Sequence, residues 1–178
     1  MQVRVAYGKG HLNIDIPEDR NTVIEPSHRV GLPDERAALI KAIADPVAAK
    51  PLRDWWSPGK TVCIVFTDIT RATPNERLIP WLLAELHEYG VRRDSITLLN
   101  STGTHRGNTP EELDRMLTPE VARNYRVINH DCHASGDTVQ FGETTTGKPA
   151  LINRWLANAD LRIITGFIEP HFFAGFSG

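Results

Sequence analysis

Residues 61–76 read TVCIVFTDITRATPNE, and this stretch decides the fold. It begins with a continuous apolar run, which is typical of a strand covered on both faces of a sheet. A short polar cluster follows, and Thr73 to Glu76 then has the pattern of a capping box with a proline in the first helical turn. The stretch therefore predicts a strand, a polar loop and a helix, in that order.

The same order recurs along the rest of the chain. Further apolar runs lie at 95–100, 126–130 and 161–167, and segments with helix-start signals separate them. One such signal is the capping box that begins at Thr109. Alternating strands and helices are typical of a parallel α/β sheet. We therefore expect residues 61–178 to form a parallel sheet flanked by helices, a Rossmann-like α/β core.

Residues 1–60 have a different pattern. VRVAYG and LNIDI alternate apolar and polar residues on either side of Gly8-Lys9-Gly10, which predicts a hairpin. TVIEP at 22–26 is a third strand candidate, residues 34–44 have helical periodicity, and residues 46–60 resemble a connecting loop. We expect a β-rich N-terminal segment with one helix over 1–60, and the core that carries the site over 61–178.

Composition limits the classes of protein. The 178 residues carry a formal net charge of -2, so the basic excess of a general nucleic-acid binder is missing. The sequence contains no apolar run near the ~20 residues that a membrane span needs. The N-terminus lacks the apolar region of a signal peptide, and the two cysteines, Cys63 and Cys132, make no disulfide framework. We expect a cytoplasmic protein without nucleic-acid or membrane partners.

A polar cluster follows each of the four predicted core strands. The clusters are Asp68 to Arg71, Thr102 to Arg106, Asn129 to His133, and Glu169 to His171. Ligands of open parallel sheets bind beyond the carboxyl ends of the strands. Because parallel strands end at the same edge, we expect these clusters to converge on one site.

Each residue type in these clusters has a structural and a functional interpretation. Asp68 could cap a turn, and Arg71 could pair with it or present a planar fork to a carboxylate or phosphate. Gly103 allows either a tight turn or the close approach of an anion to the backbone. His105 and His171, taken singly, are more often structural, but two imidazoles at one edge suit proton transfer in both directions.

The run from His130 to His133 raises the question of zinc. Zinc sites usually combine two ligand pairs, and no second cysteine pair exists in the sequence. A hydrogen-bonded loop that orients the strand end is the preferred interpretation. A metal-dependent hydrolase that uses Asp68, His105, His130 and His133 is a weaker alternative, and we assign no metal ligand in this chain.

Four stretches together resemble the nickel-pincer lactate racemase family of 2-hydroxy acid racemases and epimerases. They are DITRATP at 68–74, GTHRGNTPEEL at 103–113, RVINHD at 126–131 and EPHFFAGFSG at 169–178. The resemblance implies the cofactor nickel-pyridinium-3,5-bisthiocarboxylic acid mononucleotide, whose pyridinium ring accepts a hydride from the substrate α-carbon. It also implies that His105 and His171 are the catalytic acid and base groups.

The resemblance assigns further residues. Asp68, Ile69, Thr70 and Arg71 match the stretch that binds the cofactor, and Arg71 also binds the substrate. In the family pattern, a lysine joined to the cofactor, a nickel-ligating histidine and a second, C-terminal domain follow beyond the position of Gly178. We therefore expect the N-terminal domain of a longer racemase, inactive alone, whose partners are a 2-hydroxy acid and its own C-terminal domain. The alternative is a non-catalytic module that binds an anion or mononucleotide.

Overall fold

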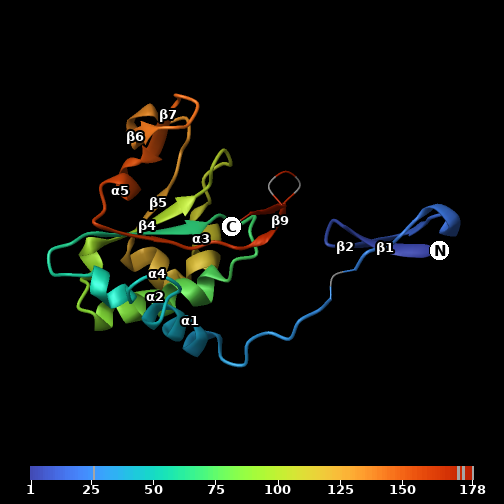
Figure 1. Cartoon of the computed structure of the whole chain (residues 1–178), viewed down its shortest axis with the longest axis horizontal. Helices are drawn as coiled ribbons and strands as arrows, with labels where there is room; N and C mark the ends of the chain where they lie inside the picture. The colour runs from blue at the N-terminus through green and yellow to red at the C-terminus, as the bar shows by residue number, and fades with distance from the viewer. Residues whose placement is uncertain (26, 172, 174, 178) are drawn as a thin grey trace. The chain divides into compact units, whose positions relative to one another are not determined.

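The computed structural model describes residues 1–25, 27–171, 173 and 175–177, so that Pro26, Phe172, Ala174 and Gly178 lie outside the described residues. The chain forms two compact units, residues 1–33 and residues 34–178 (Figure 1). Residues 34–60, which the sequence pattern groups with the N-terminal strands, are counted in the second unit. The proposed segment boundary near residue 60 stays a prediction.

The first unit is built on an antiparallel hairpin. β1 (Gln2–Tyr7) pairs with β2 (Gly10–Asp15), which confirms the predicted hairpin. Gly8 in the turn has φ +57°, a conformation that glycine adopts without steric cost. The strand predicted at 22–26 is wrong for residues 22–25, which form no strand, and Pro26 lies outside the described residues. A short β-branched run becomes a strand only where another strand pairs with it, and no described residue does so here.

The second unit contains a parallel sheet with the order β5-β4-β3-β8. The strands are β3 (Val62–Thr67), β4 (Ile96–Ser101), β5 (Arg126–Asn129) and β8 (Leu161–Ile164), and every neighbouring pair is parallel. This confirms the predicted fold class. β8 ends before the predicted residue 167, because Gly166 follows closely and glycine weakens a strand interior.

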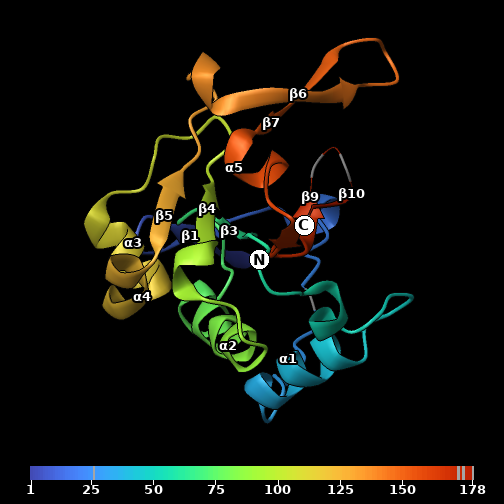
Figure 2. The same ribbon diagram turned by 90° about the vertical axis from the view of Figure 1, so that its left-hand side faces the viewer.

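Helices and hairpins complete the second unit. The α-helices are α1 (Glu35–Ala44), α2 (Asn75–Glu88), α3 (Pro110–Leu117), α4 (Pro119–Asn124) and α5 (Arg154–Ala157). The remaining strands are β6 (Thr138–Glu143), β7 (Pro149–Asn153), β9 (Glu169–His171) and β10 (Gly175–Ser177). β6 pairs with β7 and β9 with β10, both antiparallel. Figure 2 shows α2, α3 and α4 on one side of the sheet, and α5 with the β6–β7 hairpin on the other.

The core is divided unequally between the two faces of this sheet. Ile64 and Phe66 of β3 belong to the larger cluster, which packs against α2, α3 and α4. The alternate residues Cys63 and Val65 belong to a smaller cluster beneath α5. Burial raises the pKa of the Cys63 thiol to about 11, so this cysteine is a packing residue.

The helix starts agree with the sequence at one capping box and differ at the other. At α3, the Thr109 hydroxyl accepts from the Glu112 backbone N–H and the Glu112 side chain accepts from the Thr109 backbone N–H, as predicted. The capping box predicted at Thr73 is wrong, because α2 begins after Pro74 without a side-chain cap. Asn75 instead turns back and donates from its amide to the Thr67 carbonyl at 3.1 Å.

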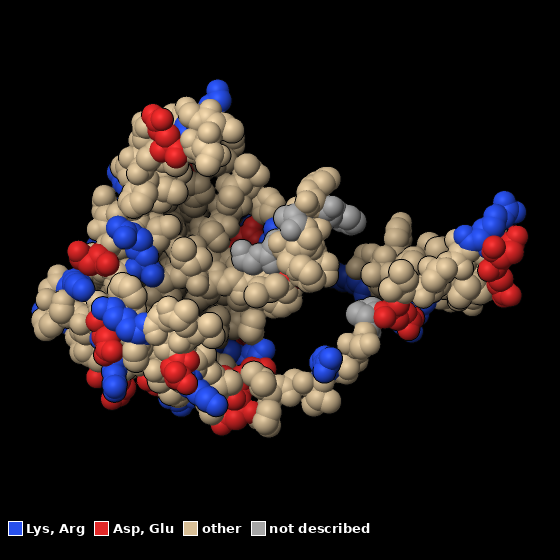
Figure 3. Space-filling view, viewed as in Figure 1, with Lys and Arg blue, Asp and Glu red and all other residues tan. Residues whose placement is uncertain are grey.

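The described helices and the visible face of the second unit bear on membrane contact and on charge. Within the described residues, no helix is both long enough and apolar enough to cross a membrane. Lys and Arg side chains are interspersed with Asp and Glu over the visible face of the second unit (Figure 3). This mixture agrees with the formal net charge of -2.

Candidate active site

The strand order creates the place for a site. From β3 the chain proceeds outward to β4 and β5, and it then returns to β8 on the other side of β3. Ligands of such sheets bind beyond the carboxyl ends of the strands where the order reverses. A cavity of about 340 Å³ lies at this position. It is lined by Thr67, Asp68, Arg71, Ser101, Thr102, Gly103, Thr104, His105 and Phe167.

Asp68 and His105 form the central contact of this cavity. Asp68 follows β3 and is 5% exposed, and its Oδ2 lies 2.5 Å from Nδ1 of His105. The other carboxylate oxygen accepts from the Thr70 hydroxyl at 2.6 Å and from the Thr70 backbone N–H at 3.1 Å. The sequence left open whether Asp68 caps a turn or serves the site. Its contacts show that it caps the Thr70 turn and also binds His105.

The ionised Asp68 carboxylate determines which ring nitrogen of His105 donates the hydrogen bond. Burial alone would raise the pKa of Asp68, but hydrogen bonds from Thr70 and His105 outweigh it and hold that pKa below its usual value. The carboxylate is therefore ionised and accepts hydrogen bonds only. Nδ1 of His105 must then be the donor, which leaves Nε2 of the neutral ring as an acceptor.

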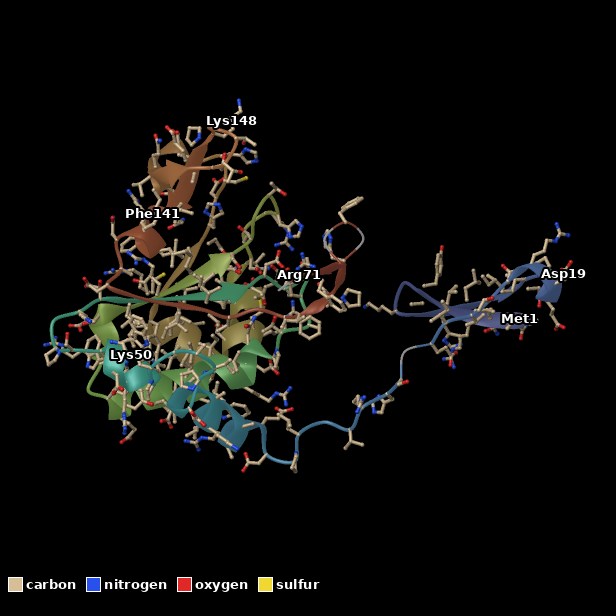
Figure 4. The ribbon with its side chains drawn as sticks, viewed as in Figure 1. Met1, Asp19, Lys50, Arg71, Phe141 and Lys148 are labelled. Atoms are coloured by element: carbon tan, nitrogen blue, oxygen red, sulfur yellow. The ribbon has the colours of Figure 1, made fainter. Side chains whose placement is uncertain are left out.

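Arg71 connects the cavity to the segment that contains His171. Nη1 of Arg71 lies 2.7 Å from Oε1 of Glu169, the first residue of β9. Figure 4 shows Arg71 beside this strand. The alternative that Arg71 pairs with Asp68 is not what the structure shows, because the side-chain partner of Arg71 is Glu169. Glu169 begins the fourth polar cluster predicted from the sequence, which assigned it no role of its own.

His171 lies two residues further along β9. Its Nδ1 accepts from the backbone N–H of Phe173 at 3.1 Å, and the two rings meet edge to face with centroids 5.8 Å apart. His171 is not among the residues that line the 340 Å³ cavity. The structure thus brings Asp68, Arg71 and His105 together, and connects His171 to them through the Arg71–Glu169 pair.

Of the remaining residues of the proposed cofactor stretch, Ile69 faces a second, smaller hollow and Thr70 does not line it. Ile69 is 37% exposed and lines a cavity of about 260 Å³ that shares Asp68 and Arg71 with the larger one. Thr70 stays on Asp68 through its hydroxyl. Asp68 and Arg71 therefore line both cavities, and the Arg71 backbone N–H closes the turn between them onto the Asp68 carbonyl at 3.2 Å.

The cluster after β5 supports the site through its backbone. The Thr102 hydroxyl donates to the His130 carbonyl at 2.5 Å, and the His130 ring contacts the Asn153 amide at 3.1 Å. Among the described residues, no group of three or more His, Cys, Asp and Glu side chains could hold a metal ion. The preferred sequence interpretation of 130–133 as a hydrogen-bonded loop agrees with these contacts.

Three asparagines lie behind the His105 loop, and of these only Asn129 belongs to a polar cluster predicted from the sequence. Asn100, Asn108 and Asn129 are hydrogen-bonded to one another. The signal available in the sequence was that Asn100 and Asn129 each lie at the carboxyl end of a predicted strand. Their direct contact depends on the register of β4 and β5, in which Asn100 lies opposite Asn129.

A larger cavity exists elsewhere, but its charged side chains are already paired. It has a volume of about 710 Å³ and lies near the first residues of β4 and β5. Its arginines already have partners, because Arg92 pairs with Asp94, while Arg93 and Arg126 stack over aromatic rings. The buried carboxylate and the histidine contact are at the smaller cavity, so we place the candidate site there.

Comparisons with known proteins point to one family. Residues 7–178 match the model of the lactate racemase N-terminal domain. The chain is 32% identical over 180 residues to the lactate racemase of Thermoanaerobacterium thermosaccharolyticum, covering 99% of this chain and 42% of that protein. It is also 32% identical over 180 residues to the lactate racemase of Lactiplantibacillus plantarum, covering 93% of this chain and 42% of that protein.

Solved structures agree with these matches. The lactate racemase apoprotein from Thermoanaerobacterium thermosaccharolyticum matches with a TM-score of 0.84 over 100% of this chain and 42% of that chain, at 32% identity. A Thermotoga maritima protein matches with a TM-score of 0.61 at 24% identity, over 80% of this chain and 35% of that chain, and supports the fold alone. The chain spans 42% of the length of the curated relatives that it matches.

Proposed function

The chain belongs to the family of lactate racemase N-terminal domains, and from this premise we propose that it is the N-terminal domain of a 2-hydroxy acid racemase or epimerase. The single observation that supports this proposal best is the contact between Asp68 and His105 beside Arg71 in one cavity. This group combines an oriented proton acceptor with a cation that fits a carboxylate. A 2-hydroxy acid offers the two matching groups, a hydroxyl and a carboxylate.

Arg71 is the proposed binding group for the substrate carboxylate. A guanidinium matches a carboxylate through two parallel N–H donors. Arg71 is 45% exposed in its side chain and already binds the carboxylate of Glu169. The Glu169 contact shows that a carboxylate fits against Arg71, and a substrate carboxylate would share or replace it.

His105 and His171 are the proposed acid and base groups. Nε2 of neutral His105 is an acceptor and can take the proton of a substrate hydroxyl. Nδ1 of His171 accepts from Phe173, so the hydrogen of the neutral ring is on Nε2. In these neutral forms, His105 has a lone pair at Nε2 and His171 has its hydrogen at Nε2. Racemisation needs both, because a proton leaves one enantiomer and returns on forming the other.

The residues at Asp68 to Arg71 fit the mononucleotide cofactor that the family resemblance implies. The cavity offers the Arg71 guanidinium and the Thr104 hydroxyl, and Gly103 has φ +60° with open space around its α-carbon. Cations, hydroxyls and exposed backbone N–H groups are what a phosphate or other anion requires. When bound, the nickel-pyridinium group would supply a hydride acceptor for the substrate α-carbon. Asp68, Ile69, Thr70 and Arg71 would hold it from this chain.

A second domain is the proposed partner of this one. Phe141, Leu151, Ile164 and Ile168 are between 59% and 78% exposed. Large apolar side chains left this exposed are candidates for contact with another domain. We propose that the C-terminal domain of the longer protein covers them and completes the site.

We also propose a cytoplasmic location for the protein. In that compartment the free thiols of Cys63 and Cys132 stay reduced.

The alternative function is a module that binds an anion or mononucleotide without turnover. The fact that the chain spans 42% of its curated relatives favours this alternative for the chain alone. The two functions share the Arg71 cavity and differ in the need for His105 and His171. A test must therefore separate binding from turnover.

The test is racemisation of D- and L-lactate by the complete, cofactor-loaded protein carrying His105→Ala or His171→Ala. Positioned acid–base groups contribute about 10²–10⁴-fold in rate. We expect losses of this size in both directions for each variant, measured per folded protein, and a melting temperature a few degrees lower in His105→Ala because that variant loses the bond to Asp68. His133→Ala, an exposed histidine outside the cavity, is the control. Turnover near the wild-type rate in either variant would remove that histidine from the mechanism.

A further inference from the structure

Three asparagine side chains lie directly behind the loop that contains His105. They are Asn100 at the end of β4, Asn108 at the end of the loop, and Asn129 at the end of β5. We propose that this asparagine cluster positions His105, so that its Nδ1 stays on Asp68. The importance of His105 rests on the proposed function, whereas the positioning itself is a property of this chain.

Each asparagine of the cluster is hydrogen-bonded to the other two, and the Asn108 amide also donates to Glu112 at 3.0 Å. The Asn100 amide donates to Oδ1 of Asn108 at 2.7 Å and to Oδ1 of Asn129 at 2.8 Å. The Asn129 amide donates to the Asn108 carbonyl at 2.9 Å, and the Asn108 backbone N–H donates to Oδ1 of Asn129 at 3.2 Å. Asn108 is therefore held through both its side chain and its backbone. It cannot move without breaking several bonds together.

The cluster fixes one end of the loop, and other bonds fix its beginning. The Ser101 hydroxyl donates to the Phe66 carbonyl at 3.0 Å, and the Thr102 hydroxyl donates to the His130 carbonyl at 2.5 Å. The His105 backbone N–H closes a turn onto the Thr102 carbonyl at 2.9 Å. With residues 101–102 and 108 both tied to the sheet, the segment between them has few ways to place the His105 ring.

Packing against Gly107 shows how closely the loop fits the cluster. A β-carbon at Gly107 would lie 3.1 Å from Nδ2 and 3.2 Å from Cγ of Asn129. These distances are shorter than ordinary van der Waals contact, so even a methyl group would displace the Asn129 amide. Gly107 is thus a second, independent position at which the cluster can be disturbed. No hydrogen-bonding atom is removed by a change there.

Burial argues that the cluster does more than fill space. Asn100 is 0% exposed, and its Oδ1 has no hydrogen-bond partner among the described residues. A buried polar atom without a partner destabilises the folded state, and an apolar side chain would avoid this. What Asn100 gains in return is the pair of bonds that tie the loop end to β5. Rigid support of this kind is what a precisely placed proton acceptor needs.

The experiment measures the tautomer of His105 in the chain by the NMR chemical shifts of its ring nitrogens. The buffer is alkaline, where an ordinary imidazole is neutral. The wild type should carry its ring hydrogen on Nδ1, because Asp68 accepts it. In Asn129→Ala the loop end is released, and we expect the Nδ1–H form to be lost as the majority species. An unchanged tautomer in folded Asn129→Ala would overturn the proposal.

Two further variants separate positioning from general stability. Gly107→Ala should shift the tautomer in the same direction, and it serves as the test if Asn129→Ala does not fold. Val121→Ala removes two methyl groups from the buried core at α4, away from the loop, and should lower stability without changing the tautomer. An equal shift in Val121→Ala would attribute the effect to stability and overturn the proposal. Loss of racemase activity is not the readout, so failure of the proposed function would not be confused with failure of this inference.

Discussion

Asp68 shows how one side chain can satisfy both interpretations that its sequence position allows. An aspartate after a strand is commonly a turn cap, and Asp68 does accept from Thr70 in that way. Its second oxygen remains for His105. Because the carboxylate has two oxygens, one can accept from Thr70 while the other accepts from His105. The turn itself fixes the oxygen that orients the imidazole.

Replacing Asp68 by asparagine should destabilise the chain at neutral pH. Hydrogen bonds to charged groups contribute about 1.5–3 kcal/mol. We expect about 1.5 kcal/mol in Asp68→Asn, at the lower end because the His105 side chain is 51% exposed. The measurement is the free energy of unfolding in urea at pH 7. Asp131→Asn, an exposed carboxyl in a neighbouring loop, should change that free energy by much less.

The destabilisation by Asp68→Asn should also depend on pH. The folded-state pKa of Asp68 lies below its ordinary value, so the unfolded chain takes up this proton first as the pH falls. The stabilisation is therefore fully present above the ordinary aspartate pKa of about 3.9, and it is lost as the pH falls through the folded-state pKa. The difference between wild type and Asp68→Asn should therefore shrink only below about pH 4. A difference that does not shrink there would contradict the hydrogen-bond account.

At the residue scale, the sequence predicted residue types better than partners. Asp68, Arg71 and His105 could be selected because each follows a predicted strand. The pairing of Arg71 with Glu169 joins residues 98 positions apart, and it depends on the path of the chain after β8. The contact of Asn100 with Asn129 depends on strand register. Neither the path nor the register is encoded in a local pattern, so neither partner could be predicted.

At the scale of elements, the two predicted capping boxes have the same sequence pattern and different outcomes. Thr109 precedes Pro110 and caps α3 with both reciprocal bonds. Thr73 precedes Pro74, yet α2 starts one residue later and Asn75 binds back to β3. The loop from Asp68 to Thr73 is fixed by the site turn, so tertiary contacts there override the local capping preference. The helices and strands themselves could be predicted, whereas this helix start could not.

Replacing Thr109 by alanine should weaken α3 without disturbing the sheet. An N-cap threonine contributes about 1 kcal/mol, because it satisfies a backbone N–H that has no partner within the helix. We expect Thr109→Ala to lower the free energy of unfolding in urea by about this amount. Thr145→Ala, at an exposed position of the hairpin between β6 and β7, is the matched control and should change it less. Equal effects of the two substitutions would show that the cap at Thr109 contributes nothing.

At the scale of the whole molecule, alternation of strands and helices sufficed to predict a parallel sheet. The order β5-β4-β3-β8 did not follow from the alternation, because β8 could have been added beside β5 with the same sequence pattern. Its place beside β3 creates the reversal of order at which Asp68 and Arg71 lie. The carboxyl-end clusters could therefore be predicted to converge, but not which two strands would flank the cavity.

Whether the chain alone binds nickel depends on the metal ligands that its side chains provide. Transition-metal sites in proteins need several nitrogen, sulfur or oxygen ligands held together. The described residues contain no group of three or more His, Cys, Asp and Glu side chains that could hold an ion. We therefore expect the chain, incubated with nickel chloride and passed through gel filtration, to retain no stoichiometric nickel by elemental analysis. Cys132→Ser is the control, because the exposed Cys132 thiol beside His133 is the group most able to bind traces of metal. One nickel per wild-type chain after gel filtration would contradict the expectation. It would also mean that residues of this chain, and not the cofactor and the proposed C-terminal domain alone, provide nickel ligands.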